Sequence, residues 1–117
     1  MLDRELKRGT LELVILTLLA ERRMYGYELV TALAGRGNGL LTVKEGTLYP
    51  ILYRLEELGH IEPEWETPAD GARRGVPRKY YRTTPAGRAE LGRLILEWRA
   101  FANTISTILD AHKETGS

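Results

Sequence analysis

The chain has 117 residues, of which 43% are hydrophobic and 28% are charged, and its formal net charge is +1. This length and composition are typical of one folded domain and are too apolar for a disordered chain. Cysteine is absent and histidine occurs only as His60 and His112, which excludes a disulfide scaffold, a thiolate zinc site, a cysteine nucleophile and a histidine-rich metal centre.

The N-terminal apolar segment is too short to cross a membrane. It spans residues 13–20, whereas a bilayer requires about 20 apolar residues. Asp3 and Glu5 precede this segment, and Glu21-Arg22-Arg23 follows it without a small-residue cleavage site. We therefore expect no signal peptide, no membrane partner and a cytoplasmic protein.

Two short helices are predicted in the first third of the chain. Apolar residues at i, i+3, i+4, i+7 and i+8 predict a helix over residues 9–20. Leu13 and Leu16 make its other side apolar too, so its own domain, or in part a partner chain, is expected to surround it. A second helix is predicted over residues 25–34, and the glycine-rich segment 35–39 ends it.

A third helix is predicted over residues 44–58. Thr42 and Glu45 have the spacing of a capping box, although a start one or two residues later also fits the pattern. Pro50 lies inside the pattern and removes one backbone hydrogen bond, which predicts a kink or a tightened first turn.

After residue 60 the apolar residues recur at every second position, in place of the helical spacing seen before. Ile61, Pro63 and Trp65 alternate with glutamates, which predicts a half-buried strand, and Pro63 indicates an edge position. A long turn rich in proline and glycine follows, and a second strand is predicted over residues 78–83. The two strands form a β-hairpin with a long tip.

A long helix is predicted at the end of the chain, starting from a Thr84 cap and Pro85 in the first helical position. Its heptad stripe of apolar residues continues to residue 109, a length of about 39 Å, and the tail at 112–117 is expected to fray. One small domain cannot cover so long a stripe, so we expect a homodimer. The expected interface residues are Leu11, Leu91, Leu94, Ile95, Trp98, Phe101, Ala102, Ile105, Ile108 and Leu109.

This order of elements is that of a winged helix-turn-helix, a mainly α fold with a small β-hairpin. We expect a DNA-binding domain at residues 1–83 and a dimerisation helix with a tail at 84–117. The outer face of the third helix offers donors and a planar ring to a major groove, and Gly46 allows its backbone to approach a phosphate. The alternative is a solvated helix face. The candidate residues on this helix are Lys44, Gly46, Thr47, Pro50, Tyr53 and Arg54.

The hairpin is the most basic segment of the chain. Five basic residues and no acidic residue lie between positions 71 and 82, which fits contacts with the phosphate backbone. The alternative is a solvated loop, or ion pairs with the neighbouring glutamates. The candidates for DNA contact are Arg73, Arg74, Arg78 and Lys79.

Trp98 lies on the heptad stripe, where packing in a dimer core is one interpretation. The other is a flat apolar pocket that stacks an aromatic effector, with Trp98 as its binding residue. An enzyme is not expected, because Ser106 and Ser117 have no obvious base and no phosphate-loop or dinucleotide motif is present. No cofactor is expected.

A series of short motifs runs from residue 8 to about residue 100. They are Arg8-Gly9-Thr10-Leu11-Glu12, Tyr25-Gly26-Tyr27-Glu28-Leu29, Gly46-Thr47-Leu48-Tyr49-Pro50, Arg54-Leu55-Glu56, Gly59, Trp65, Arg78-Lys79-Tyr80-Tyr81, Thr84 and Gly87. These motifs resemble those of the PadR family of bacterial transcriptional regulators. The resemblance implies a dimeric winged-helix repressor that releases DNA when it senses a small, often aromatic molecule. It further implies the shorter subfamily with a single C-terminal helix. One departure is Lys44-Glu45, where a small polar residue or proline is expected.

Two functions follow from these patterns. The first is a homodimeric, sequence-specific repressor that reads a pseudo-palindromic operator. The second is a winged-helix module that binds proteins and not DNA, which the near-neutral charge and the glutamates of residues 62–66 favour slightly.

Overall fold

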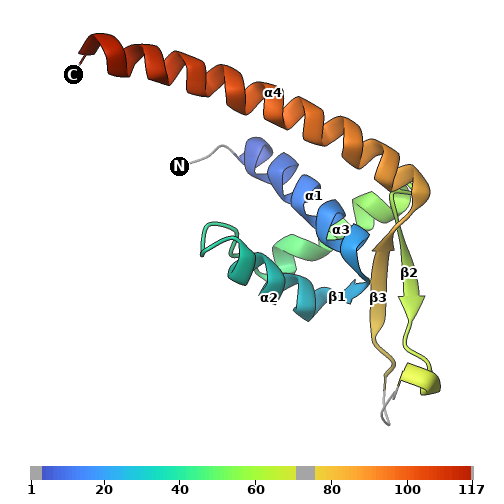
Figure 1. Cartoon of the computed structure of the whole chain (residues 1–117). Helices are drawn as coiled ribbons and strands as arrows, with labels where there is room; N and C mark the ends of the chain where they lie inside the picture. The colour runs from blue at the N-terminus through green and yellow to red at the C-terminus, as the bar shows by residue number, and fades with distance from the viewer. Residues whose placement is uncertain (1–3, 71–75, 117) are drawn as a thin grey trace.

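The computed structural model describes residues 4–70 and 76–116, with a mainly α fold and a three-stranded antiparallel sheet (Figure 1). This architecture confirms the predicted fold class. The elements in chain order are α1 (Arg4–Glu21), β1 (Met24–Tyr25), α2 (Gly26–Arg36), α3 (Glu45–Glu57), β2 (Ile61–Trp65), a 3-10 turn (Pro68–Asp70), β3 (Lys79–Thr83) and α4 (Pro85–Gly116).

The start of α3 differs from the capping box predicted at Thr42. Lys44 is the N-cap residue and has no side-chain capping bond, while the Thr42 hydroxyl donates to the Gly39 carbonyl at 3.1 Å. The later start is therefore the correct one. The N–H groups of Thr47 and Leu48 both donate to the Lys44 carbonyl at 3.0 Å, so the first turn is tightened as Pro50 predicts.

The sheet contains the predicted hairpin and one strand that the sequence analysis missed. Its strand order is β1-β3-β2, so β2 is an edge strand and accommodates Pro63. The short strand β1 pairs with the other edge of β3, with Met24 opposite Tyr81. Because β1 joins α1 to α2, this pairing fixes the hairpin against the helical body.

The core lies between α1, α2, α3 and the inner face of β3. Leu11 and Leu91 were predicted in the dimer interface, but the structure places both in this core. Leu11 is 2% exposed and Leu91 is 8% exposed within the single chain. Their side chains pack inside the protomer and offer no surface to a second copy. The Thr83 hydroxyl, also buried, donates to the Leu16 carbonyl at 2.9 Å and joins β3 to α1.

The start of α4 is set at the end of the hairpin. Thr84 caps it as predicted, because its hydroxyl oxygen accepts the Gly87 N–H at 3.0 Å. Gly87 is required here, since a side chain would collide with the His60 carbonyl. The helix then continues to Gly116, so the predicted frayed tail is wrong over residues 112–116.

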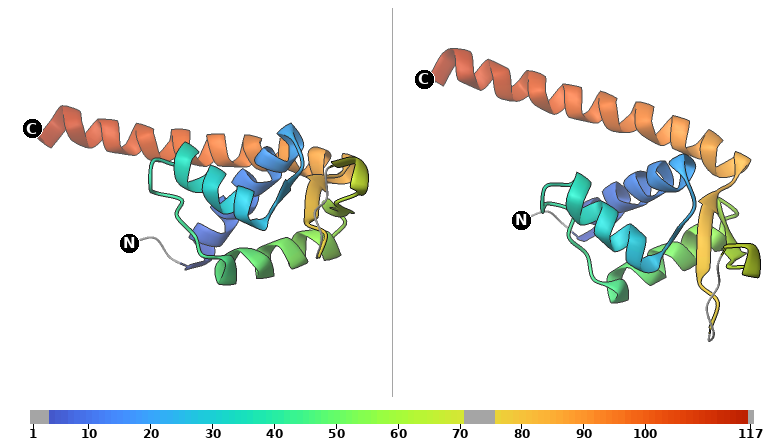
Figure 2. Two further views of the ribbon diagram at one scale, coloured as in Figure 1. Left: turned by 90° about the horizontal axis from the view of Figure 1, so that it is seen from below. Right: turned by 60° about the horizontal axis from the view of Figure 1, so that its bottom comes forward.

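Beyond this start, α4 crosses α1 and its C-terminal part continues past the body (Figure 1). Two further views show the same projection (Figure 2) and agree with molecular extents of 64 × 28 × 21 Å. Within the described ranges, no helix is long and apolar enough to span a membrane.

Candidate nucleic-acid interface

The third helix separates a buried face from an exposed one. Leu48, Ile51, Leu52 and Leu55 lie in the core. The predicted DNA-facing residues all lie at the surface, and Tyr53 is 57% exposed. The helix is therefore anchored on one side and offers a polar side to a partner. The exposed candidates are Lys44, Gly46, Thr47, Pro50, Tyr53 and Arg54.

Tyr49 and Tyr53 are four residues apart on α3 and have different environments. Their ring centroids are 6.0 Å apart, but the Tyr49 hydroxyl turns inward onto Gly26, where a side chain would collide with it. Burial raises the pKa of the Tyr49 hydroxyl, and the Glu45 carboxylate raises it further. Tyr49 therefore remains protonated and positions α3 against α2, which leaves Tyr53 available to a ligand.

Arg54 forms an ion pair with Glu12 of α1, a residue 42 positions away in the sequence. Glu12 was not among the predicted site residues, because Arg54 was expected to be a free donor on the exposed face of the third helix. The sequence signals for Glu12 were its place in the Arg8-Gly9-Thr10-Leu11-Glu12 motif and an acidic charge among the apolar residues of the first helix. The pair ties the exposed face of α3 to the adjacent helix.

The described basic residues of the hairpin are paired with carboxylates. Arg78 lies 3.9 Å from Glu66, and its guanidinium lies over the Tyr25 ring, 4.7 Å from the centroid. The Lys79 ammonium lies 3.6 Å from Glu56 of α3. Arg78 therefore has the neighbouring glutamate partner that the second interpretation of the hairpin expected. Lys79 instead connects the hairpin to α3.

Arg82 also has a carboxylate partner, because it lies 3.6 Å from Glu64, which pairs in addition with Arg23 at 3.1 Å. The other two basic candidates, Arg73 and Arg74, lie outside the described residues. Their predicted role continues to rest on their charge alone.

A hollow of about 450 Å³ separates α3 from the base of the hairpin. Its wall combines aromatic rings with two cations, a composition suited to a sugar-phosphate backbone. The lining includes Tyr25, Tyr49, Tyr53, Trp65, Arg78 and Lys79.

The apolar stripe of α4 is largely uncovered. Leu94 and Ile95 pack partly against the core, and Ala102 is half-buried. Leu91 is buried, and the members after it are otherwise exposed, including Trp98 at 48% and Phe101 at 57%. The other exposed members are Ile105, Ile108 and Leu109.

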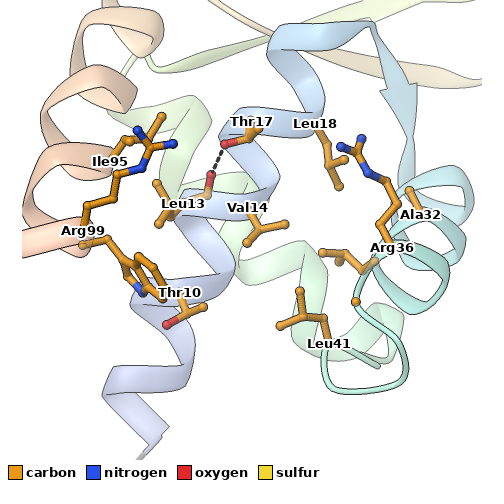
Figure 3. A pocket seen from close by; sticks show the side chains of 13 residues that line it. Thr10, Leu13, Val14, Thr17, Leu18, Ala32, Arg36, Leu41, Ile95 and Arg99 are labelled. Atoms are coloured by element: carbon orange, nitrogen blue, oxygen red, sulfur yellow. Dashed lines mark hydrogen bonds between the residues drawn. The ribbon is translucent and has the colours of Figure 1, made fainter. Parts of the chain in front are cut away.

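An apolar hollow of about 460 Å³ lies between α1, α2 and α4 (Figure 3). Leu13 and Val14 of α1 form its floor, Trp98 is among the lining residues, and Arg36 and Arg99 approach it from α2 and α4. The Thr17 hydroxyl donates a hydrogen bond to the Leu13 carbonyl at 2.9 Å. A second hollow of about 360 Å³ also includes Trp98.

Three helices with an exposed third helix, followed by a hairpin that packs beside it, define a winged helix-turn-helix protein. The family model of the PadR-like transcriptional regulators matches residues 15–93. The chain therefore belongs to this family. It is a family of DNA-binding regulators of transcription and not a family of enzymes.

Relatives in both sequence and structure agree with this membership. Transcriptional regulator Rv3488 of Mycobacterium tuberculosis is 41% identical over 88 residues, 75% of each chain. A Lysinibacillus sphaericus protein called uncharacterized protein X is 36% identical over 110 residues, 94% of this chain and 97% of the relative.

Two solved structures have the same fold. A PadR family regulator from Eggerthella lenta superposes with a TM-score of 0.75 at 37% identity, covering 90% of this chain and 86% of that one. A transcriptional regulator from Clostridium thermocellum gives a TM-score of 0.77 at 30% identity, covering 92% and 97%.

Proposed function

We propose that this protein is a homodimeric, sequence-specific repressor that reads a pseudo-palindromic operator. The observation that carries the proposal is the combination of an exposed polar face on α3 with an uncovered apolar stripe on α4. The first feature suits a major groove, and the second requires a second copy.

The dimer is supported by the position of the stripe. The exposed apolar side chains repeat along one side of α4, and the C-terminal part of this helix continues past the body (Figure 1). Large apolar patches of this kind are rarely left in water and mark interaction surfaces. A second α4 packed against it would place two α3 helices on one DNA duplex, about 34 Å apart.

The DNA contacts divide into two kinds. Thr47, Tyr53 and Arg54 would face base edges, because they lie on the exposed side of α3. Lys44 and the basic residues of the hairpin would contact phosphates, with Arg73 and Arg74 included on charge. The hollow beside Tyr53 and Lys79 provides space for the backbone between these two groups.

Effector release is the finer part of the proposal. The apolar hollows beside Trp98 lie between the DNA-binding body and α4, so a flat aromatic ligand bound there would change their angle. Such a ligand should quench indole fluorescence. The quench should disappear in Trp98→Leu, which retains Trp65, and unchanged quenching would remove Trp98 from the effector site.

The central experiment is a selection of bound sequences from random DNA, combined with sedimentation of the protein alone and on the selected site. A symmetric site bound by two chains is expected. A chain that remains monomeric at micromolar concentration and enriches no sequence would contradict the proposal and favour the protein-interaction module.

A further inference from the structure

The guanidinium of Arg54 has an asymmetric environment. Its Nη1 atom donates to Oε1 of Glu12. The Arg54 side chain is 50% exposed, whereas the Glu12 side chain is only 16% exposed. The carboxylate is therefore mostly covered by the protein, whereas half of the cation's side chain lies at the surface.

This asymmetry makes Glu12 a strong partner for Arg54. A carboxylate that has lost most of its water is unfavourable without a cation, so releasing Arg54 would leave Glu12 poorly solvated. The guanidinium carries five N–H donors in a rigid fork. Pairing through one edge fixes its direction and leaves the remaining donors for a ligand.

The pairing also changes how Arg54 responds to DNA. A phosphate attracts any cation whatever the sequence, and the Glu12 charge weakens this attraction. Hydrogen bonds from a fixed guanidinium to the edge of a base depend instead on which base is present. A paired Glu12 would therefore weaken the nonspecific contact of Arg54 with phosphates and leave its base-specific contact in place.

We propose that Glu12 is a specificity-determining residue of the DNA-binding surface, which acts by orienting Arg54 and neutralising its charge. The inference rests on the proposed function, because it requires a protein that discriminates an operator from random DNA. It adds a residue of α1 that does not itself face the groove.

The test is Glu12→Gln, which keeps the shape and an acceptor oxygen but removes the charge. Affinity for random DNA should rise, with a salt dependence steeper by about 0.9 for each phosphate that the released Arg54 contacts. The ratio of operator to random affinity should fall. Fluorescence anisotropy at several salt concentrations measures both quantities, and circular dichroism checks the fold.

Glu45→Gln is the matched control, because Glu45 is an exposed acid at the start of the same helix. It should also raise the affinity for random DNA by removing repulsion, and this effect should persist in an Arg54→Gln background. The effect of Glu12→Gln should vanish in that background, because it acts through Arg54.

Arg54→Lys provides a second variant that retains the charge but lacks the fork. It should lower operator affinity and leave random affinity unchanged. If Glu12→Gln lowers both affinities equally together with the melting temperature, Glu12 only braces the fold and the inference is wrong. The inference is also wrong if Glu12→Gln still raises the affinity for random DNA in the Arg54→Gln background. If the unaltered protein itself fails to discriminate, the proposed function is what fails.

Discussion

At the scale of single residues, the third helix uses similar side chains for different purposes. Tyr49 packs against a glycine of α2 and holds the helix in place, whereas Tyr53 points to solvent. Arg54 is exposed and yet committed to Glu12. Surface position on α3 therefore does not by itself identify a residue that contacts DNA.

Gly26→Ala should destabilise the fold, because the new methyl group would collide with the Tyr49 hydroxyl. Overpacking of this kind costs about 1–3 kcal/mol of unfolding free energy. Gly35→Ala is the control, since nothing lies within 4 Å of a side chain at that helical position and alanine there should be neutral or slightly stabilising. Equal losses in chemical denaturation would refute the close contact.

Thr47→Ala should reduce operator affinity by about fivefold for each protomer, the value of one hydrogen bond of about 1 kcal/mol in each half-site. The side chain is exposed, so the melting temperature and the affinity for random DNA should not change. Thr104→Ala, exposed on α4, is the control. Titrations with operator and scrambled duplexes measure the difference. A loss of equal size on both duplexes would assign Thr47 to the backbone instead.

At the scale of secondary structure, residue periodicity was sufficient to predict most elements. The three short helices, the hairpin with Pro63 at its edge and the Thr84 cap follow from local patterns, and each is present. These features depend on residues close together in the sequence. The exposed side of α3 was predictable for the same reason, because its inner side is a regular apolar face.

Features that depend on distant contacts could not be read from spacing. The strand β1 has two residues, too few for an alternating pattern, and exists only because β3 offers it a free edge. Leu11 and Leu91 fit an interface pattern, but both side chains are buried in the core of one chain. The partner of Arg54 lies on another helix, where no local rule finds it.

Phe101→Glu should convert the protein to a monomer and abolish tight operator binding. A carboxylate in the apolar stripe of α4 would have to lose its water in a dimer interface. Asn103→Glu adds the same charge at an exposed position outside the stripe and should leave the dimer intact. Size-exclusion chromatography with light scattering distinguishes the two. A dimeric Phe101→Glu variant would place the interface elsewhere.

At the scale of the whole molecule, electrostatics are local. The net charge is +1, and the described basic residues of the hairpin are already paired with carboxylates. DNA must therefore compete with internal partners for these cations. We expect the DNA affinity to depend less steeply on salt than the number of basic residues implies. A cation already paired with a carboxylate neutralises less phosphate charge and so releases fewer counterions from the DNA.

Lys44→Gln should reduce the slope of log affinity against log salt by about 0.9 for each protomer. Lys44 is exposed at the N-terminus of α3, where amide groups also favour an anion. Arg93→Gln is the control, because Arg93 is paired with Glu90 at 2.6 Å on α4. An unchanged slope in the Lys44 variant would exclude a phosphate contact there.

The joint between hairpin and α4 has a geometric consequence. The Thr84 N–H donates to the His60 carbonyl at 3.0 Å, its hydroxyl donates to the Gly59 carbonyl at 2.6 Å, and Gly87 closes against the same segment. An α-helix of 32 residues is about 48 Å long, so a tilt of about 5° at this joint displaces its far end by about 4 Å. One base-pair step is about 3.4 Å. In the proposed dimer, a rigid joint of this kind would restrict binding to operators with one spacing between the half-sites, whereas a looser joint would accept insertions between them.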